Sequence, residues 1–394
     1  MRRRLWAPSS YRGFTTSAKM ARQVTRSFPA SFVRGGTSND LILDRAHLPD
    51  NIDEWQPILA SAMGSPDASG RQLNGLGQGI SSTSKVCVIS RSKRNGVDVD
   101  YTFVQVGIKG GDLDVAGNCG NMSSAVGPMA WDIGLAKRDR VAQSDGEVNL
   151  RLFNWNTNKI LHSTFAIDHS GDYDPMGDYK LDGVAGGGSK ITLSFVDPAG
   201  SKTGNALPTG NAIDQLRLSD GSCVKASLVD VANPGVFILA SDAGISGSIS
   251  PDVLGSDPQL MSRLQDIRDE GARRMGLDPN IQSIPKIVLV SEPPESEAAQ
   301  GINIVCRALS MQQAHKAVPL TLALNLGAAC GITGTIPART AVNLGACDRI
   351  TIAHASGQVE VGSIVKNGKI ESAKLHRTAR LLMRGDVYYT VDDP

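Results

Sequence analysis

The chain contains 394 residues, of which 41% are hydrophobic and 20% charged, a composition typical of a globular protein. Single hydrophobic cores rarely grow to this size, so two domains are expected. The net charge of +1 conceals an asymmetry, because residues 1–39 carry eight basic side chains and no acidic one. The rest of the chain is therefore acidic, which excludes nucleic acid as a partner of the folded body.

Residues 1–27 are expected to be a basic targeting or disordered segment. They are rich in arginine, serine and threonine and lack both acids and the apolar core of a secretory signal, as mitochondrial transit peptides do. A start at Met20 would instead leave a shorter, cytoplasmic form. The longest uncharged stretch, 317–337, contains proline, threonine, asparagine and glycine, so no membrane span is expected.

Most of the chain that follows is predicted to be β-structure, because its segments alternate in polarity or are β-branched. The strands are expected at 86–90, 97–106, 148–153, 190–196, 224–231, 235–240, 284–290, 303–309, 349–353 and 359–365. Two apolar segments rich in alanine and glycine, 122–135 and 320–332, are predicted to be equivalent central helices of two half-molecules. A third helix, 259–275, follows a capping aspartate and a proline and is predicted to lie on the surface.

These elements indicate an α/β (α+β) protein, and their pattern suggests two pseudo-symmetric half-barrel domains, each a mixed sheet curled round one buried helix. The main support for this doubling is the resemblance to a known family that is given below. The N-terminal domain is expected over residues 28–200 and the C-terminal domain over 201–394, joined at the turn 197–200. The last segment of the chain can pack back on the first domain.

One cysteine, Cys119, stands between two Gly-Asn dipeptides at the predicted start of the first central helix. The neighbouring glycines let the backbone approach a ligand closely, and the free N–H groups of the first helical turn favour an anion or a thiolate. A small buried hydrophobe in a turn is the alternative interpretation. The other cysteines, which show no paired spacing and are expected to be free thiols, are at 87, 223, 306, 330 and 347.

Neither a metal nor another cofactor is expected. The six histidines are scattered and no H-E-x-x-H motif is present. The glycine-rich stretch 183–190 places serine before lysine, the reverse of the order in a phosphate-binding P-loop, and 75–79 is not a dinucleotide fingerprint.

Several motifs, taken together and in chain order, resemble the signatures of the PrpF family. They lie at 33–38 (VRGGTS), 81–86 (SSTSKV), 119–128 (CGNMSSAVGP), 201–211, 230–237, 354–361 and 377–383. Known members isomerise 2-methylaconitate, aconitate, methylitaconate or 4-oxalomesaconate without a cofactor, in a fold similar to that of diaminopimelate epimerase. The resemblance therefore implies that fold and that class of reaction.

The resemblance also implies that Lys85 and Cys119 are the catalytic pair that moves protons. A thiolate is accessible at a helix N-terminus next to an ammonium group, and either residue can be the base while the other is the acid. Backbone N–H groups of 120–122 and 316–321 are expected to hold two substrate carboxylates. The expected substrate-binding residues are Arg34, Gly36, Thr37, Ser38, Ser82, Thr83, Ser84, Asn118, Gly120, Asn121, Met122, Ser310, Met311 and His315. His315 either binds a carboxylate or caps the second central helix.

Two departures from related enzymes bear on the reaction. Related epimerases use a second cysteine at the start of the second central helix, whereas Cys330 lies about two turns past that point and Cys306 lies in a strand, so a two-thiol racemase is excluded. Asn39 and Asp40 stand where many relatives have Lys-Gly, which leaves the identity of the substrate open.

The predicted function is a cofactor-independent isomerase that moves a proton and a double bond in an unsaturated tri- or dicarboxylate of the 2-methylaconitate or aconitate type. The alternatives are a 4-oxalomesaconate-type keto–enol tautomerase and a non-catalytic, carboxylate-binding accessory protein. The only partner required is the small-molecule acid, and a homodimer is a compatible assembly.

Overall fold

The structure is a computed structural model that describes residues 22–136, 143–144, 146–344, 349–366 and 369–392. The mitochondrial prediction depends on residues 1–21, which lie outside the described residues, as does Cys347. The predicted boundary at residue 27 is wrong, because strand β1 (Gln23–Gly35) begins inside the segment that was expected to be unstructured.

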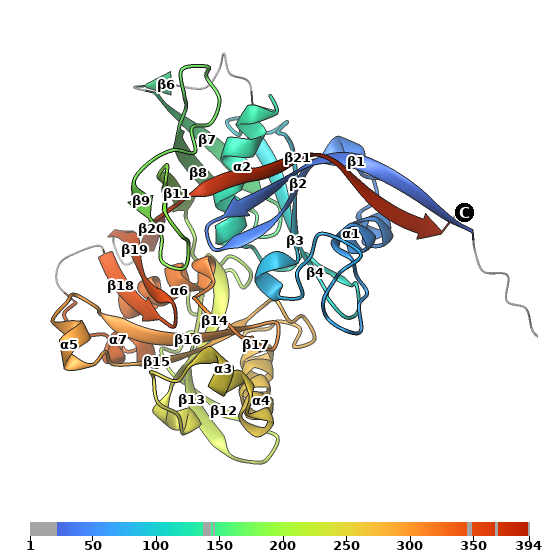
Figure 1. Cartoon of the computed structure of the whole chain (residues 1–394). Helices are drawn as coiled ribbons and strands as arrows, with labels where there is room; N and C mark the ends of the chain where they lie inside the picture. The colour runs from blue at the N-terminus through green and yellow to red at the C-terminus, as the bar shows by residue number, and fades with distance from the viewer. Residues whose placement is uncertain (1–21, 137–142, 145, 345–348, 367–368, 393–394) are drawn as a thin grey trace, which may run out of the picture.

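The first half of the chain forms a curved mixed sheet around one helix (Figure 1). Its helices are α1 (Trp55–Met63) and α2 (Gly120–Asp132). After β1 its strands are β2 (Ser38–Asp44), β3 (Lys85–Arg91), β4 (Val99–Val106), β5 (Leu113–Asp114), β6 (Gln143–Ser144), β7 (Glu147–Asn154), β8 (Lys159–Ala166), β9 (Tyr179–Lys180), β10 (Gly187–Gly188) and β11 (Ile191–Val196). The main strands pair in the order β1-β2-β3-β4-β7-β8-β11, parallel at β2–β3 and β4–β7 and antiparallel elsewhere.

The second half repeats this arrangement. Its helices are α3 (Pro251–Gly255), α4 (Pro258–Arg274), α5 (Glu295–Ala298), α6 (Leu320–Cys330) and α7 (Ile336–Thr340). Its strands are β12 (Asp214–Arg217), β13 (Cys223–Val231), β14 (Asn233–Leu239), β15 (Lys286–Ser291), β16 (Ile304–Ser310), β17 (Gln313–Ala314), β18 (Arg349–His354), β19 (Gly357–Lys366), β20 (Lys369–Arg377) and β21 (Ala379–Asp392). The order β13-β14-β15-β16-β18-β19-β20 again has two parallel pairs, β14–β15 and β16–β18.

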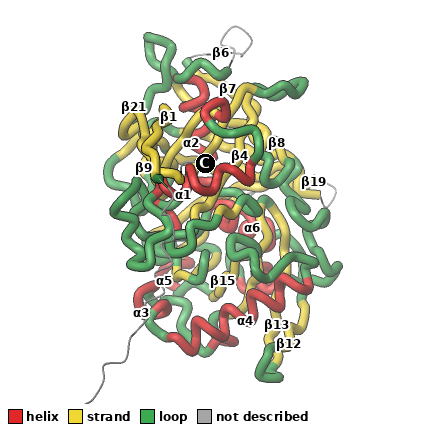
Figure 2. Tube along the Cα trace, turned by 90° about the vertical axis from the view of Figure 1, so that its right-hand side faces the viewer, coloured by secondary structure: helices red, strands yellow, loops and turns green. Residues whose placement is uncertain are grey.

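The two central helices are buried because they present apolar or small residues on all sides. Every residue of α6 is buried, and in α2 only Asp132 is not. The outer helices are one-sided: α1 places Trp55 and Leu59 against the outer face of the first sheet, and α4 does the same with Leu264 and Ile267 on the second. Figure 2 shows α2 and α6 inside their sheets and α4 along the outside of the second half.

Two long-range strand pairs join the halves into one sheet. β11 pairs with β20 from Ile191↔Arg377 to Val196↔Ser372, and β21 pairs with β1 along nearly its whole length. The last strand thus lies beside the first, and the two extend together beyond the body of the molecule (Figure 1). Residues 379–392 complete the first half, although they follow the second half in the chain.

The predicted fold class and the two equivalent central helices are confirmed, and each expected strand is present within a few residues. Among the longer elements, the sequence analysis missed α1, which has Pro57 in its first turn, and the strands β1, β2, β8, β20 and β21. It also missed the short helices α3, α5 and α7 and the short strands β5, β6, β9, β10, β12 and β17. β21 gives little signal because most of its side chains are exposed on both faces.

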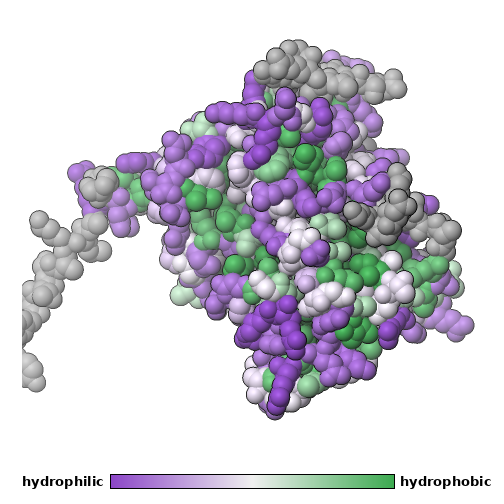
Figure 3. All heavy atoms as spheres, turned by 180° about the vertical axis from the view of Figure 1, so that it is seen from behind, coloured by the Kyte–Doolittle hydropathy of each residue, from purple (hydrophilic) through white to green (hydrophobic). Residues whose placement is uncertain are grey.

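The helices of the described segments include none that is long and apolar enough to cross a bilayer. On the back face of the molecule, hydrophobic residues form small groups between hydrophilic ones (Figure 3).

Candidate active site

A cavity lies where the two halves meet at the N-termini of α2 and α6. The two helix starts touch, since a Cβ atom on Gly120 would lie 3.0 Å from the Cβ of Leu320. The hydroxyl of Thr321, in the first turn of α6, donates to the carbonyl of Asn118 at 3.4 Å. The residues that line the cavity are Ser38, Ser81, Lys85, Phe103, Gln105, Gly117, Asn118, Cys119, Gly120, Asn121, Ser283, Lys286, Ser310, Met311, His315, Pro319, Leu320 and Thr321.

Cys119 is the N-cap residue of α2 and is partly exposed to the cavity. Its backbone is extended (φ −113°, ψ 100°), and its side chain caps no backbone N–H. The positive end of the α2 dipole faces this part of the cavity. Pro319 takes the equivalent position before α6, so the second half offers no thiol there.

Lys85 is the first residue of β3 and is buried in the cavity wall. Its ammonium group donates to Oε1 of Gln105 at 2.8 Å and to the hydroxyl of Ser81 at 3.4 Å. The Gln105 amide is oriented in turn by its own donation to the carbonyl of Ser84 at 2.8 Å. The glutamine is a neutral partner, so it positions the lysine without neutralising its charge.

His315 lines the same cavity and is held by the backbone beside it. Its Nδ1 atom accepts the N–H of Ala317 at 3.0 Å. Burial lowers the pKa of His315 to about 4, so the ring is neutral at pH 7 and carries its proton on Nε2. His315 therefore orders the chain before α6 and keeps one N–H donor for a ligand.

Asn121 links the β1–β2 turn to the last strands. Its side-chain amide donates to the hydroxyl of Thr37 at 2.9 Å and accepts from Nε of Arg377 at 3.2 Å. Arg377 is buried, and burial lowers its pKa to about 10. The sequence analysis did not single out this second cation near the start of α2.

Most of the predicted site residues come together. A second hollow shares Ser81, Ser310 and His315 with the cavity and adds Thr37 and Ser82 to its mouth. Five predicted residues line neither hollow: Arg34, Gly36, Thr83, Ser84 and Met122.

Each of these five has another structural role. Arg34 donates to the carbonyls of Gly36 at 2.9 Å and Thr378 at 3.0 Å, so it fastens the β1–β2 turn to β20 and β21 rather than facing the cavity. Gly36 packs against Asn121. The hydroxyls of Thr83 and Ser84 donate to backbone carbonyls, and Met122 lies in the core.

Lys286, the first residue of β15, is the main residue that the sequence analysis missed. It is buried in the cavity wall and donates to the carbonyl of Ser283 at 2.5 Å. The repeat of the two halves could have revealed it, because Lys286 stands at the start of the second parallel strand as Lys85 does in the first half.

The charge of the cavity is one-sided. Lys85 and Lys286 line it, and none of the described lining residues is an aspartate or a glutamate. The described residues also contain no group of three or more histidine, cysteine, aspartate or glutamate side chains that could hold a metal ion. This arrangement suits an organic anion with several carboxylates.

Residues 25–390 match the family described as PrpF protein. The chain belongs to the PrpF family. This PrpF-family chain is 35% identical to the 3-methylitaconate isomerase of Eubacterium barkeri and 33% identical to the 2-methyl-aconitate isomerase of Cupriavidus necator, in each case over 91% of this chain and 96% of the relative. A crystal structure of methylitaconate-delta-isomerase superposes with a TM-score of 0.73 at 34% identity, covering 93% of this chain and 96% of that one.

These relatives confirm three of the predictions made from the sequence of this PrpF-family chain: the family, the two-half fold and an enzyme of the isomerase class. The substrates in the names of these enzymes are those of the relatives.

Proposed function

We propose that this PrpF-family chain moves a proton and a double bond in an unsaturated tri- or dicarboxylate of the 2-methylaconitate or aconitate type. The main support for this proposal is that Lys85 and Cys119 line one cavity, beside the N-terminus of a helix and a second lysine. None of the described residues in the cavity wall is acidic. Proton carriers and anion-binding groups thus share one small space.

The reaction needs one proton removed from a carbon and one delivered to another carbon of the same allylic system. When a base removes the first proton, negative charge spreads through the double bond onto a carboxylate oxygen. Backbone N–H groups at the start of α2 and the nearby ammonium groups stabilise that charge. A second group, acting as the acid, then delivers a proton two carbons away, and the double bond shifts by one position toward the carbon that lost its proton.

Lys85 and Cys119 are the two groups that we assign to these proton transfers. In one direction of the reaction one of them is the base and the other the acid, and the roles exchange in the reverse direction. Gln105 holds the ammonium group of Lys85 in the cavity wall. No metal, flavin or nucleotide has a step in this scheme.

Deuterium exchange tests the reaction directly. The purified protein is incubated in D₂O with 2-methylaconitate, aconitate, methylitaconate or 4-oxalomesaconate, and proton NMR follows both isomer formation and loss of C–H signals. We expect isomerisation with exchange of one of the first two acids, unchanged by EDTA. Turnover of 4-oxalomesaconate alone would identify a tautomerase, and binding without exchange an accessory protein.

Two substitutions test the catalytic pair. Cys119→Ser and Lys85→Ala each remove a proton carrier from the cavity wall, so each is expected to lower kcat by at least about 100-fold while the melting temperature stays within a few degrees. Cys223→Ser is the control, because Cys223 is exposed and lies outside the cavity. Near-normal turnover by either cavity variant would contradict the assignment.

A further inference from the structure

Lys286 has the same place in the second half that Lys85 has in the first. Lys85 begins β3, which lies between β2, to which it is parallel, and β4, to which it is antiparallel. Lys286 begins β15, which lies in the same way between β14 and β16. Each of the two strands β3 and β15 begins at the cavity, and the central helix of the same half, α2 or α6, also starts there. The internal repeat therefore brings two lysines to one cavity from opposite halves of the molecule.

The loop before Lys286, residues 278–285, is fixed from both halves. Ser283 donates its N–H and its hydroxyl to the carboxylate of Asp114 in β5, at 3.1 and 2.8 Å. On the other side, the buried guanidinium of Arg268 in α4 donates to four carbonyls of the loop, those of Pro279, Ile281, Ile284 and Pro285.

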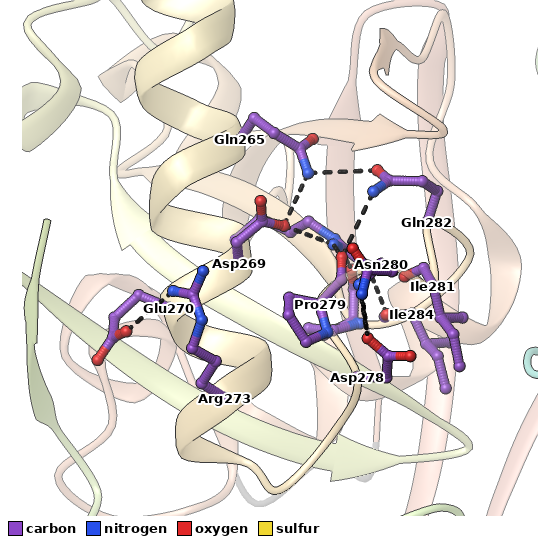
Figure 4. Close-up of polar contacts among 12 residues, drawn as sticks. Gln265, Asp269, Glu270, Arg273, Asp278, Pro279, Asn280, Ile281, Gln282 and Ile284 are labelled. Carbon is purple, nitrogen blue, oxygen red and sulfur yellow. Dashed lines mark hydrogen bonds and ion pairs between the residues drawn. The ribbon is translucent and has the colours of Figure 1, made fainter. Parts of the chain in front are cut away.

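Side-chain contacts between α4 and the loop add to this anchoring. Gln265 donates to Asp269 at 2.7 Å and to Gln282 of the loop at 3.2 Å, and Figure 4 shows these side chains meeting between the helix and the loop. The Ser283 carbonyl that accepts from Lys286 is thus held rigidly. The ammonium group of Lys286 is placed before any ligand arrives.

This placement costs stability in the empty protein. Burial lowers the pKa of Lys286 to about 8; the negative charges of Cys119 and Asp114 act against this shift, and the positive charge of Lys85 adds to it. Within the described part of the chain, the ammonium group donates one hydrogen bond, to the Ser283 carbonyl, so two of its N–H bonds are left to donate. A buried ammonium group in such surroundings is compensated when an anion binds.

We propose that Lys286 binds a carboxylate of the substrate from the second half of the molecule, while Lys85 and Cys119 act on the reacting carbons. This assignment rests on the proposed function, because it takes the substrate to be a polycarboxylate. It gives the second half, which has Pro319 in place of a catalytic thiol, a direct part in substrate recognition.

The test compares Lys286→Met and Lys286→Arg with Lys225→Met, which removes one exposed lysine from β13. Isothermal titration calorimetry measures the binding of tricarballylate, a saturated tricarboxylate that cannot be isomerised. We expect Lys286→Met to weaken binding about 10- to 100-fold, Lys286→Arg to restore part of it, and Lys225→Met to bind like the wild type. The melting temperature of unliganded Lys286→Met should equal or exceed that of the wild type.

The outcomes separate this proposal from the proposed function. Unchanged binding and KM in Lys286→Met would overturn the role of Lys286 alone. Weak binding joined to a lowered melting temperature in both Lys286 variants would also overturn it, in favour of a structural role. If the wild-type protein binds tricarballylate but exchanges no deuterium into any of the acids, the proposed reaction is contradicted and the role of Lys286 as a carboxylate ligand stands. If the protein neither binds nor turns over any of the acids, both proposals are contradicted.

Discussion

Gly36 shows how a residue can belong to a functional motif without touching the ligand. It lies in the β1–β2 turn with a positive φ of 53°, and a Cβ atom at this position would lie 2.3 Å from Oδ1 of Asn121. The same oxygen accepts from Arg377, and the amide nitrogen donates to Thr37. The glycine is therefore needed so that Asn121 can hold both partners at the cavity.

Gly36→Ala is expected to destabilise the protein by about 2 to 3 kcal/mol and to lower turnover at least tenfold, because it combines backbone strain with displacement of Asn121. Gly221→Ala is the matched control: Gly221 has a φ of 82°, but no described atom lies within 4 Å of its added Cβ. It should lose only about 1 kcal/mol and keep its activity. Urea unfolding and a turnover assay measure both effects, and equal losses in the two variants would contradict this account.

At the scale of elements, the connection between the halves depends on one buried carboxylate. Asp230, in β13, accepts from the hydroxyl of Ser201 at 2.6 Å, from the N–H groups of Lys202 and Thr203 at 2.8 Å, and from the hydroxyl of Thr203 at 2.9 Å. Two of the motifs shared with the PrpF family, 201–211 and 230–237, thus bind each other rather than a ligand.

Asp230→Asn is expected to lower the free energy of unfolding by about 2 kcal/mol, because the amide NH₂ would face buried donors and leave at least one of them unsatisfied. Asp242→Asn makes the same chemical change at an exposed position and should be nearly neutral. Denaturant titration of the two variants tests the expectation. A loss that is no larger at Asp230 than at Asp242 would show that the connection is held by other contacts.

At the scale of the whole molecule, the two halves are expected to unfold together. β21 supplies the first half with a partner for β1, and β20 supplies one for β11, so neither half completes its sheet alone. Trp55, Trp131 and Trp155 lie in the first half, so in a chain with Trp6 replaced by phenylalanine the fluorescence follows that half, whereas far-UV circular dichroism follows both. The two signals should change at the same denaturant concentration.

Deleting β21 extends the same test. A chain that ends at residue 378 lacks the strand that pairs with β1 from Gln23 to Gly35, so the tryptophan transition should move to a clearly lower denaturant concentration. A fluorescence transition that is separate from the dichroism change, and indifferent to the deletion, would instead show that the halves fold independently.

Local patterns in the sequence were sufficient for the central helices, for most strands and for the position of Cys119 at a helix start. Helix caps, glycines and polarity repeats act over a few residues, so the chain near each one already contains the cause. Lys85 and the neighbouring hydroxyls followed from motifs of the same kind. By contrast, Arg34 was assigned to the site from its motif, and the hydrogen bond that it donates to the carbonyl of Thr378, 344 positions away in the sequence, places it elsewhere.

Ser310, Met311 and His315 of the second half were predicted from the sequence and line the cavity, but only the tertiary structure showed that Lys286 does so too. Lys286 lies in an ordinary strand sequence, and the hydrogen bonds of Ser283 to Asp114 fix its loop against the first half. Arg377 also lies in an ordinary strand sequence, and the pairing of β20 with β11 carries it to Asn121. The position of β21 beside β1 likewise depends on pairing between strands at opposite ends of the chain. By itself the sequence determined the family, the class of fold and the site residues that lie in local motifs; long-range contacts, which no local pattern encodes, added Lys286 to the cavity and placed Arg34 outside it.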